Sequence, residues 1–157
     1  MAYLLDTHVI LWALDNNGRL STKAESIISD LNSDCFVSVI SFFEMTIKTN
    51  IGKLKLSKSI QEYINEVERI GIISLPIKDE YLNNYNNIPL FENHRDPFDR
   101  LILATAFTEK FYILSADDKF KLYKDVVDVI ITRRTKCCWW ENALNTKFLA
   151  IFRREPC

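Results

Sequence analysis

Ala2-Tyr3-Leu4-Leu5-Asp6-Thr7, at the start of the chain, is the stretch that decides the fold. Its four apolar residues indicate a short buried strand, and an acid follows at once. Residues 8–14 continue as a helical pattern until Asn16-Asn17-Gly18, a combination typical of turns. An apolar strand without polar alternation favours a parallel sheet, because helices cover both faces of such a sheet.

The same alternation of strand and helix continues to about residue 131. Short apolar runs indicate strands, and apolar residues three and four apart indicate helices. We predict strands at 2–5, 35–40, 72–75, 111–115 and 126–131. We predict helices at 8–14, after the cap Ser21, from Ser41 to near Gly52, from Ile60 to Gly71, at 78–87, and from Pro97 to about Lys110. This order is that of an α/β domain with a central parallel sheet.

Composition and charge limit the kinds of partner. The chain has 157 residues, of which 48% are hydrophobic and 26% charged, as in an ordinary folded domain. The formal net charge is −1, so no global positive field attracts a polyanion. Any binding of nucleic acid must therefore come from local basic residues or from bound metal ions.

The chain carries no sequence signal for export or for membrane insertion. Its start lacks the basic segment that opens a signal peptide. No apolar stretch approaches the roughly 18 residues of a membrane-spanning helix. We therefore expect a cytoplasmic protein with no membrane partner, in which Cys35, Cys137, Cys138 and Cys157 stay reduced.

Acidic residues lie where the predicted strands end. Asp6 ends the first strand, and Asp117 follows the fourth. Glu44 lies just inside the helix after the second strand, and Asp99 in the first turn of the helix that leads to the fourth. Sites in open parallel sheets gather beyond the carboxyl ends of the strands. We therefore expect these four acids to converge at one edge of the sheet.

Converging carboxylates predict a metal-dependent reaction. They repel one another until a cation binds between them. Oxygen ligands without cysteine or histidine favour Mg²⁺ or Mn²⁺, which activate water and stabilise charge on a phosphate under attack. We predict a phosphodiesterase in which Asp6, Glu44 and Asp99 hold one Mg²⁺ and Asp117 completes the cluster or a second site. All four are thus predicted to be both catalytic and metal-binding.

Each acid also has an ordinary structural alternative. Ser41-x-x-Glu44 matches a helix capping box, which would explain Glu44 without any chemistry. Asp6 could cap the next helix, Asp99 could complement a helix dipole, and Asp117 could be a turn residue. The joint placement of the four favours function, because these alternatives must explain each residue separately.

Other charged residues give weaker signals. His8 and His94 are more often ordinary hydrogen-bonding residues than ligands. His94, Arg95, Arg100 and the lysines at 48, 53 and 55 could contact phosphates, although a solvated surface explains the lysines slightly better. With glycine only at 18, 52 and 71, neither GxGxxG nor GxxxxGK[ST] is present. An aspartyl-phosphate mechanism at Asp6 lacks the second acid that would help it two residues on.

Several motifs resemble those of PIN-domain toxins of the VapC kind. Tyr3-Leu4-Leu5-Asp6-Thr7-His8 resembles their start, and Val37 to Lys48 their second-acid segment. His94-Arg95-Asp96-Pro97-Phe98-Asp99-Arg100 is similar to a run typical of one VapC subgroup. Leu114-Ser115-Ala116-Asp117 is similar to their last-acid segment, which usually has threonine where Ser115 stands. The motifs span residues 2 to about 131 in matching order.

The resemblance implies a three-layer α/β/α sandwich and an endoribonuclease that depends on Mg²⁺ or Mn²⁺. It implies that Asp6, Glu44, Asp99 and Asp117 are the metal-binding acids. It further implies an RNA substrate, a cognate antitoxin protein, a homodimer, and operator DNA bound only through the toxin–antitoxin complex. Two other functions fit the same residues: a PIN nuclease that acts on DNA, and a non-catalytic binding or regulatory module.

The resemblance ends before the chain does. We divide the chain into a PIN-like nuclease domain at 1–131 and a basic C-terminal extension at 132–157, whose structure the pattern does not define. Six basic residues against two acidic ones give the extension a charge of +4. Residues 143–152 have the apolar spacing of one amphipathic helix.

Overall fold

The computed structural model describes residues 1–15 and 18–132. Its strands are β1 (Ala2–Leu5), β2 (Asp34–Ser38), β3 (Ile73–Leu75), β4 (Tyr112–Ser115) and β5 (Val129–Ile131). Its helices are α1 (Thr7–Leu14), α2 (Thr22–Ser29), α3 (Val39–Asn50), α4 (Ile60–Arg69), α5 (Asp79–Asn84) and α6 (Pro97–Glu109). Short 3₁₀ helices follow at Tyr85–Asn87 and Asp118–Tyr123.

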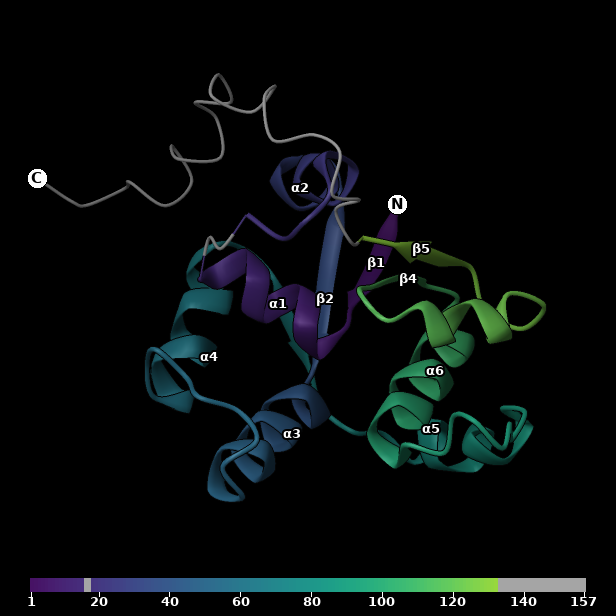
Figure 1. The fold of residues 1–157 in the computed structure, drawn as a ribbon. Coiled ribbons are helices and arrows are strands. Elements are labelled where there is room, and N and C mark those ends of the chain that lie inside the picture. Colours follow the sequence, from purple (N-terminus) through teal and green to yellow (C-terminus); the bar gives the residue numbers. More distant parts are fainter. Residues whose placement is uncertain (16–17, 133–157) are drawn as a thin grey trace, which may run out of the picture.

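The strands form one parallel sheet in the order β3-β2-β1-β4-β5. β1 comes first in the chain but lies in the centre of the sheet (Figure 1). Leu5 at the end of β1 pairs with Val37 of β2 and with Leu114 of β4. The carboxyl ends of three strands therefore meet around the residue that follows Leu5.

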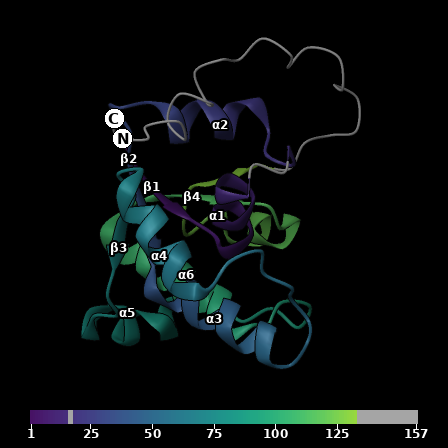
Figure 2. The ribbon, with the colours of Figure 1, turned by 90° about the vertical axis from the view of Figure 1, so that its left-hand side faces the viewer.

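Helices cover both faces of the sheet. On one face α1 and α4 pack on Tyr3 and Leu5, and on the other α5 and α6 pack on Leu4. The side with α1 and α4 faces the viewer in Figure 2. Successive strand residues point to opposite faces, so a strand buried on both sides has no polar positions. This explains the unbroken apolar runs and confirms the predicted α/β/α sandwich.

Helix α3 begins earlier than the sequence pattern predicts. The predicted strand 35–40 ends at Ser38, whose hydroxyl accepts a hydrogen bond from the amide of Ile40 at 3.3 Å and caps α3. Ser41 is therefore inside the helix, and the predicted capping box with Glu44 is wrong. Val39 and Ile40 fit a strand and a helix equally well, so apolar periodicity cannot locate the boundary.

The end of the sheet differs in a similar way. The fifth strand, predicted at 126–131, is shorter in the structure. A 3₁₀ helix and a turn precede it, and β5 begins only at Val129. Thr132, the first residue of the predicted extension, accepts a backbone hydrogen bond from Ser21 and donates one to Ser115. The rest of the predicted extension, including the helix at 143–152, lies outside the described residues. In the described part of the chain, no helix has the length and apolarity needed to cross a membrane.

Two serines test where α3 begins. We expect Ser38→Ala to lower the free energy of unfolding by about 1 kcal/mol, the usual cost of losing a helix cap. Ser41→Ala should leave it unchanged or raise it, because the buried Ser41 hydroxyl has no hydrogen-bond partner among the described residues. Urea unfolding of both variants measures the difference. If Ser41→Ala lowered the free energy of unfolding more than Ser38→Ala, this would support the predicted capping box instead.

Candidate metal centre at the carboxyl edge of the sheet

Asp6 and Asp117 come together because their strands are neighbours in register. The Asp6 amide donates to the carbonyl of Leu114 at 2.9 Å, which extends the pairing of β1 and β4 by one residue. Opposite Asp6, the hydroxyl of Ser115 donates to Asp6 Oδ2 at 2.9 Å. The same hydroxyl accepts a hydrogen bond from the amide of Asp117 at 3.0 Å. Ser115 therefore orients one acid directly and the other through its backbone.

Glu44 reaches the same place from α3. Its side chain is almost fully buried, and both carboxylate oxygens have a partner. The hydroxyl of Thr7, at the start of α1, donates to Oε2, and Lys48, one turn further along α3, forms an ion pair with Oε1. These contacts fix the carboxylate beside Asp6 and explain why Glu44 takes no part in capping α3.

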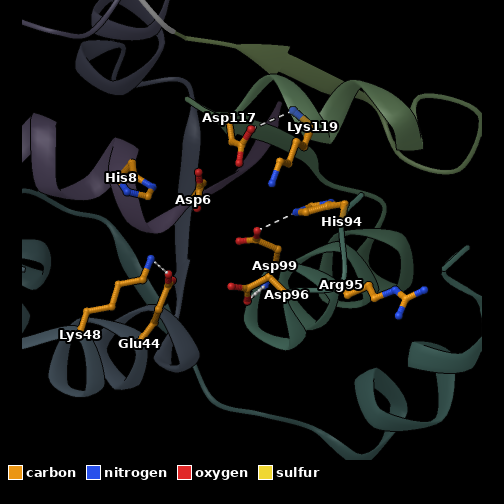
Figure 3. Close-up of a pocket in the computed structure, with 10 residues that line it drawn as sticks. All are labelled: Asp6, His8, Glu44, Lys48, His94, Arg95, Asp96, Asp99, Asp117 and Lys119. Atoms are coloured by element: carbon orange, nitrogen blue, oxygen red, sulfur yellow. Dashed lines mark hydrogen bonds and ion pairs between the residues drawn. The ribbon is translucent and has the colours of Figure 1, made fainter. Parts of the chain in front are cut away.

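Asp99 is carried by the first turn of α6. Asp96 caps this helix, accepting hydrogen bonds from the amides of Phe98 and Asp99 at 2.8 and 3.4 Å, and Pro97 occupies the first turn. The predicted helix start is therefore confirmed. Because the start is fixed, the Asp99 side chain faces the end of β1 across from Glu44 (Figure 3).

One pocket of about 170 Å³ contains all four predicted acids. Its lining consists of Asp6, His8, Glu44, Lys48, His94, Arg95, Asp96, Asp99, Asp117 and Lys119. Figure 3 shows Asp99 and Asp117 pointing towards Asp6, whereas Arg95 points away from the acids. The structure thus brings together the acids of four separate segments, as the strand-end argument predicts.

Burial and mutual repulsion disturb the protonation of this cluster. Burial is the largest cause that raises the pKa of Asp6, and the charge of Glu44 adds to it, whereas His8 and Ser115 oppose it. Burial, together with the charges of Asp6 and Asp96, raises the pKa of Asp99 to about 8. Without a bound cation, Asp99 therefore holds a proton through much of the neutral range.

Three contacts at the site escape the sequence reasoning. Thr7 and Ser115 act as supports of Glu44 and Asp6, and both lie within two residues of a predicted acid. His94 is almost fully buried, with Nε2 placed 2.8 Å from Asp99 Oδ2. Its position five residues before Asp99 indicated that it could lie near the site. Spacing alone does not show that its ring contacts Asp99 in the first turn of α6.

The composition of the pocket fits a divalent cation. Five carboxyl groups and three cationic side chains line the pocket, but Arg95 points away from the acids and Lys48 is already paired with Glu44. When the five acids are ionised, the excess of two negative charges equals the charge of one divalent ion. Oxygen-rich sites of this kind suit Mg²⁺ and Mn²⁺.

The raised pKa of Asp99 predicts how stability depends on pH. The folded, metal-free protein holds this proton up to about pH 8, whereas an unfolded chain releases it near the ordinary aspartate pKa of 3.8. The free energy of unfolding in EDTA should therefore fall as pH rises from about 4 to about 8. Asp99→Asn stays neutral, so its decline should be smaller. Chemical unfolding at a series of pH values measures this free energy. An equal decline for the wild type and Asp99→Asn would contradict the prediction.

Comparison with known proteins gives this pocket its family context. The family model of the PIN domain matches residues 3–126. Among curated proteins, none matches the chain. Solved structures that resemble it include VapBC2 from Rickettsia felis bound to a DNA fragment from its promoter, with 16% identity, a TM-score of 0.62, and coverage of 84% of this chain and 99% of that one.

Two further solved structures also resemble this chain. VapBC-1 from nontypeable Haemophilus influenzae has 18% identity and a TM-score of 0.56, with 83% and 98% of the two chains covered. FitAcB from Neisseria gonorrhoeae has 19% identity and a TM-score of 0.54, with 82% and 96% covered. Likeness at this level of identity shows a shared fold. Since the family match spans most of the sequence, the chain belongs to the PIN domain family.

Proposed function

We propose that this chain is a Mg²⁺- or Mn²⁺-dependent endoribonuclease and the toxin half of a type II toxin–antitoxin pair. The observation that carries the proposal is the convergence of Asp6, Glu44, Asp99 and Asp117 in one pocket. PIN domains are generally metal-dependent nucleases, which supports hydrolysis of a phosphodiester. The resemblance to VapC toxins favours RNA as the substrate.

In the proposed mechanism the protein holds the reacting groups in place. Asp6, Glu44 and Asp99 would hold one divalent ion, with Asp117 completing the cluster or a second position. A bound divalent ion activates water and stabilises charge on the attacked phosphate. Ser115, Thr7 and Lys48 keep two of these carboxylates oriented through the contacts described above. Such fixed groups need no reorganisation during the reaction, which is a large part of catalysis by charge.

The substrate must approach an edge that is itself acidic. Lys119 lines the pocket and points towards the acids in Figure 3. Its ammonium group would contact a phosphate oxygen beside the cleaved bond, a contact that positions nucleic acid without reading its sequence. Because water is the proposed nucleophile, the 2′-hydroxyl has no required part in the cleavage step.

The proposed partners follow from the structural relatives. The structures from Rickettsia felis and Haemophilus influenzae are VapBC proteins, the one from Neisseria gonorrhoeae is FitAcB, and one from Klebsiella pneumoniae is a toxin–antitoxin complex. For this chain we likewise propose a cognate antitoxin that blocks the acidic pocket and a homodimer. We also propose that operator DNA is bound only through the toxin–antitoxin complex. The proposed location is the cytoplasm, where the RNA substrate is.

Cleavage assays with matched variants test the activity. Purified full-length protein should cut RNA in Mg²⁺ and not in EDTA. Asp6→Asn and Asp99→Asn should each lose at least about 100-fold in rate, on the order of losing one group that stabilises transition-state charge. Asp79→Asn is the control, because Asp79 is also an acid in the first turn of a helix, but it is exposed and outside the pocket.

Each outcome of this assay has a defined meaning. Cleavage by Asp6→Asn at the wild-type rate would remove that residue from the mechanism. Faster cleavage of DNA than of RNA would favour the DNA-nuclease alternative. A folded, metal-loaded protein that cuts neither would support the non-catalytic binding module.

Expression in cells tests the toxin assignment. We expect the wild-type protein to arrest growth, because its substrate is cellular RNA, and Asp6→Asn to relieve the arrest without reducing the amount of protein. Growth curves with immunoblots measure both effects. Equal arrest by the two proteins would show that toxicity does not come from the acidic pocket.

A further inference from the structure

His94 occupies an unusual position beside the acids. It is 2% exposed, and its ring lies between Asp99 and the 3₁₀ helix Asp118–Tyr123. Nε2 is 2.8 Å from Asp99 Oδ2, and Nδ1 is 3.1 Å from the hydroxyl oxygen of Tyr123. The ring thus has one nitrogen in the pocket and the other in the core.

The contacts of Tyr123 are compatible with a proton on Nδ1. The Tyr123 hydroxyl donates to the backbone carbonyl of His94 at 3.4 Å, so its oxygen is available to accept from Nδ1–H. In the neutral ring, Nε2 then presents its lone pair to the pocket. A second partner that holds the Nδ1 proton is the usual arrangement for a metal-binding histidine.

In the metal-free protein, the proton held by Asp99 lies between its carboxyl group and Nε2, which are 2.8 Å apart. When a cation binds, that proton would leave and both atoms could act as ligands. Nε2, an oxygen of Asp99 and an oxygen of Asp117 all lie within 4.8 Å of one another. The 2.8 Å separation is close to the roughly 3 Å between neighbouring ligands of an octahedral ion with bonds of about 2.1 Å.

We propose that His94 Nε2 is a direct ligand of a divalent cation at the second position of the site, together with Asp99 and Asp117, and that it makes this position prefer Mn²⁺ over Mg²⁺. Imidazole suits transition metals better than it suits Mg²⁺, which prefers oxygen. The inference rests on the metal dependence in the proposed function. It also revises the expectation that the site has oxygen ligands alone and that His94 is an ordinary hydrogen-bonding residue.

Electron spin-echo spectroscopy of Mn²⁺ bound to the full-length protein tests this directly. A coordinated imidazole nitrogen modulates the echo, and replacing ¹⁴N-histidine with ¹⁵N-histidine changes that modulation without changing the protein. The chain has two histidines, and both line the pocket. We expect the modulation in the wild type and in the control His8→Gln, and its loss in His94→Gln.

Affinity gives a second measurement of the same contact. In calorimetric titrations, His94→Gln should weaken Mn²⁺ binding by at least about tenfold, in line with typical effects of changes around a metal site. Mg²⁺ binding should weaken less. Bound Mn²⁺ without a histidine nitrogen signal in the wild type would overturn the proposal, and so would a signal that disappears in His8→Gln but not in His94→Gln.

The spectroscopy does not depend on RNA cleavage. A nitrogen signal from His94 in a protein that cuts no RNA would support the ligand and contradict the nuclease. Cleavage in Mg²⁺ without a nitrogen signal from bound Mn²⁺ would support the nuclease and overturn the ligand. A protein that binds no Mn²⁺ would overturn this inference.

Discussion

Repulsion among buried carboxylates is the constraint that shapes this site. Asp6 and Glu44 are each 2% exposed, so water does little to screen their charges. Asp99 and Asp117 face them across one small pocket. Such an arrangement costs free energy in the folded protein, and burial of the apolar clusters on the two faces of the sheet offsets this cost. A fold selected for stability alone would not gather these residues.

The protein relieves part of this repulsion with fixed partners. Glu44 has the hydroxyl of Thr7 and the ammonium group of Lys48, and Asp6 has the hydroxyl of Ser115. Asp99 has no cationic side chain of comparable closeness among the described residues; its near neighbour is the imidazole of His94. Between Asp99 and Asp117 we therefore place the cation that His94 binds, which would displace the proton of Asp99.

The parts of the site that follow from the sheet could be predicted from sequence. A parallel sheet places the residues after its strands at one edge, and this is enough to locate Asp6 and Asp117. Asp96-Pro97 fixes the start of α6 and hence the direction of Asp99. The prediction that Glu44 lies with the other acids was correct. The alternative that Glu44 belongs to a capping box was wrong, because Ser38 caps α3.

The remaining contacts depend on segments that meet only in three dimensions. Thr7 is 37 residues from Glu44, and Ser115 is 109 residues from Asp6. The orientation of His94 depends on Tyr123, which is 29 residues further along the chain. Periodicity, composition and capping signals describe neighbours within a few residues, so they cannot reveal such pairs.

The location of a bound ion tests the central claim most directly. Crystals of the full-length protein grown with Mn²⁺ would show the metal as a peak of anomalous scattering. We expect a peak inside the acidic pocket, bound by Asp99 together with at least one other of the four acids. A well-ordered pocket with no peak, or Mn²⁺ bound only elsewhere on the protein, would contradict the view that this cluster of carboxylates exists to hold a cation.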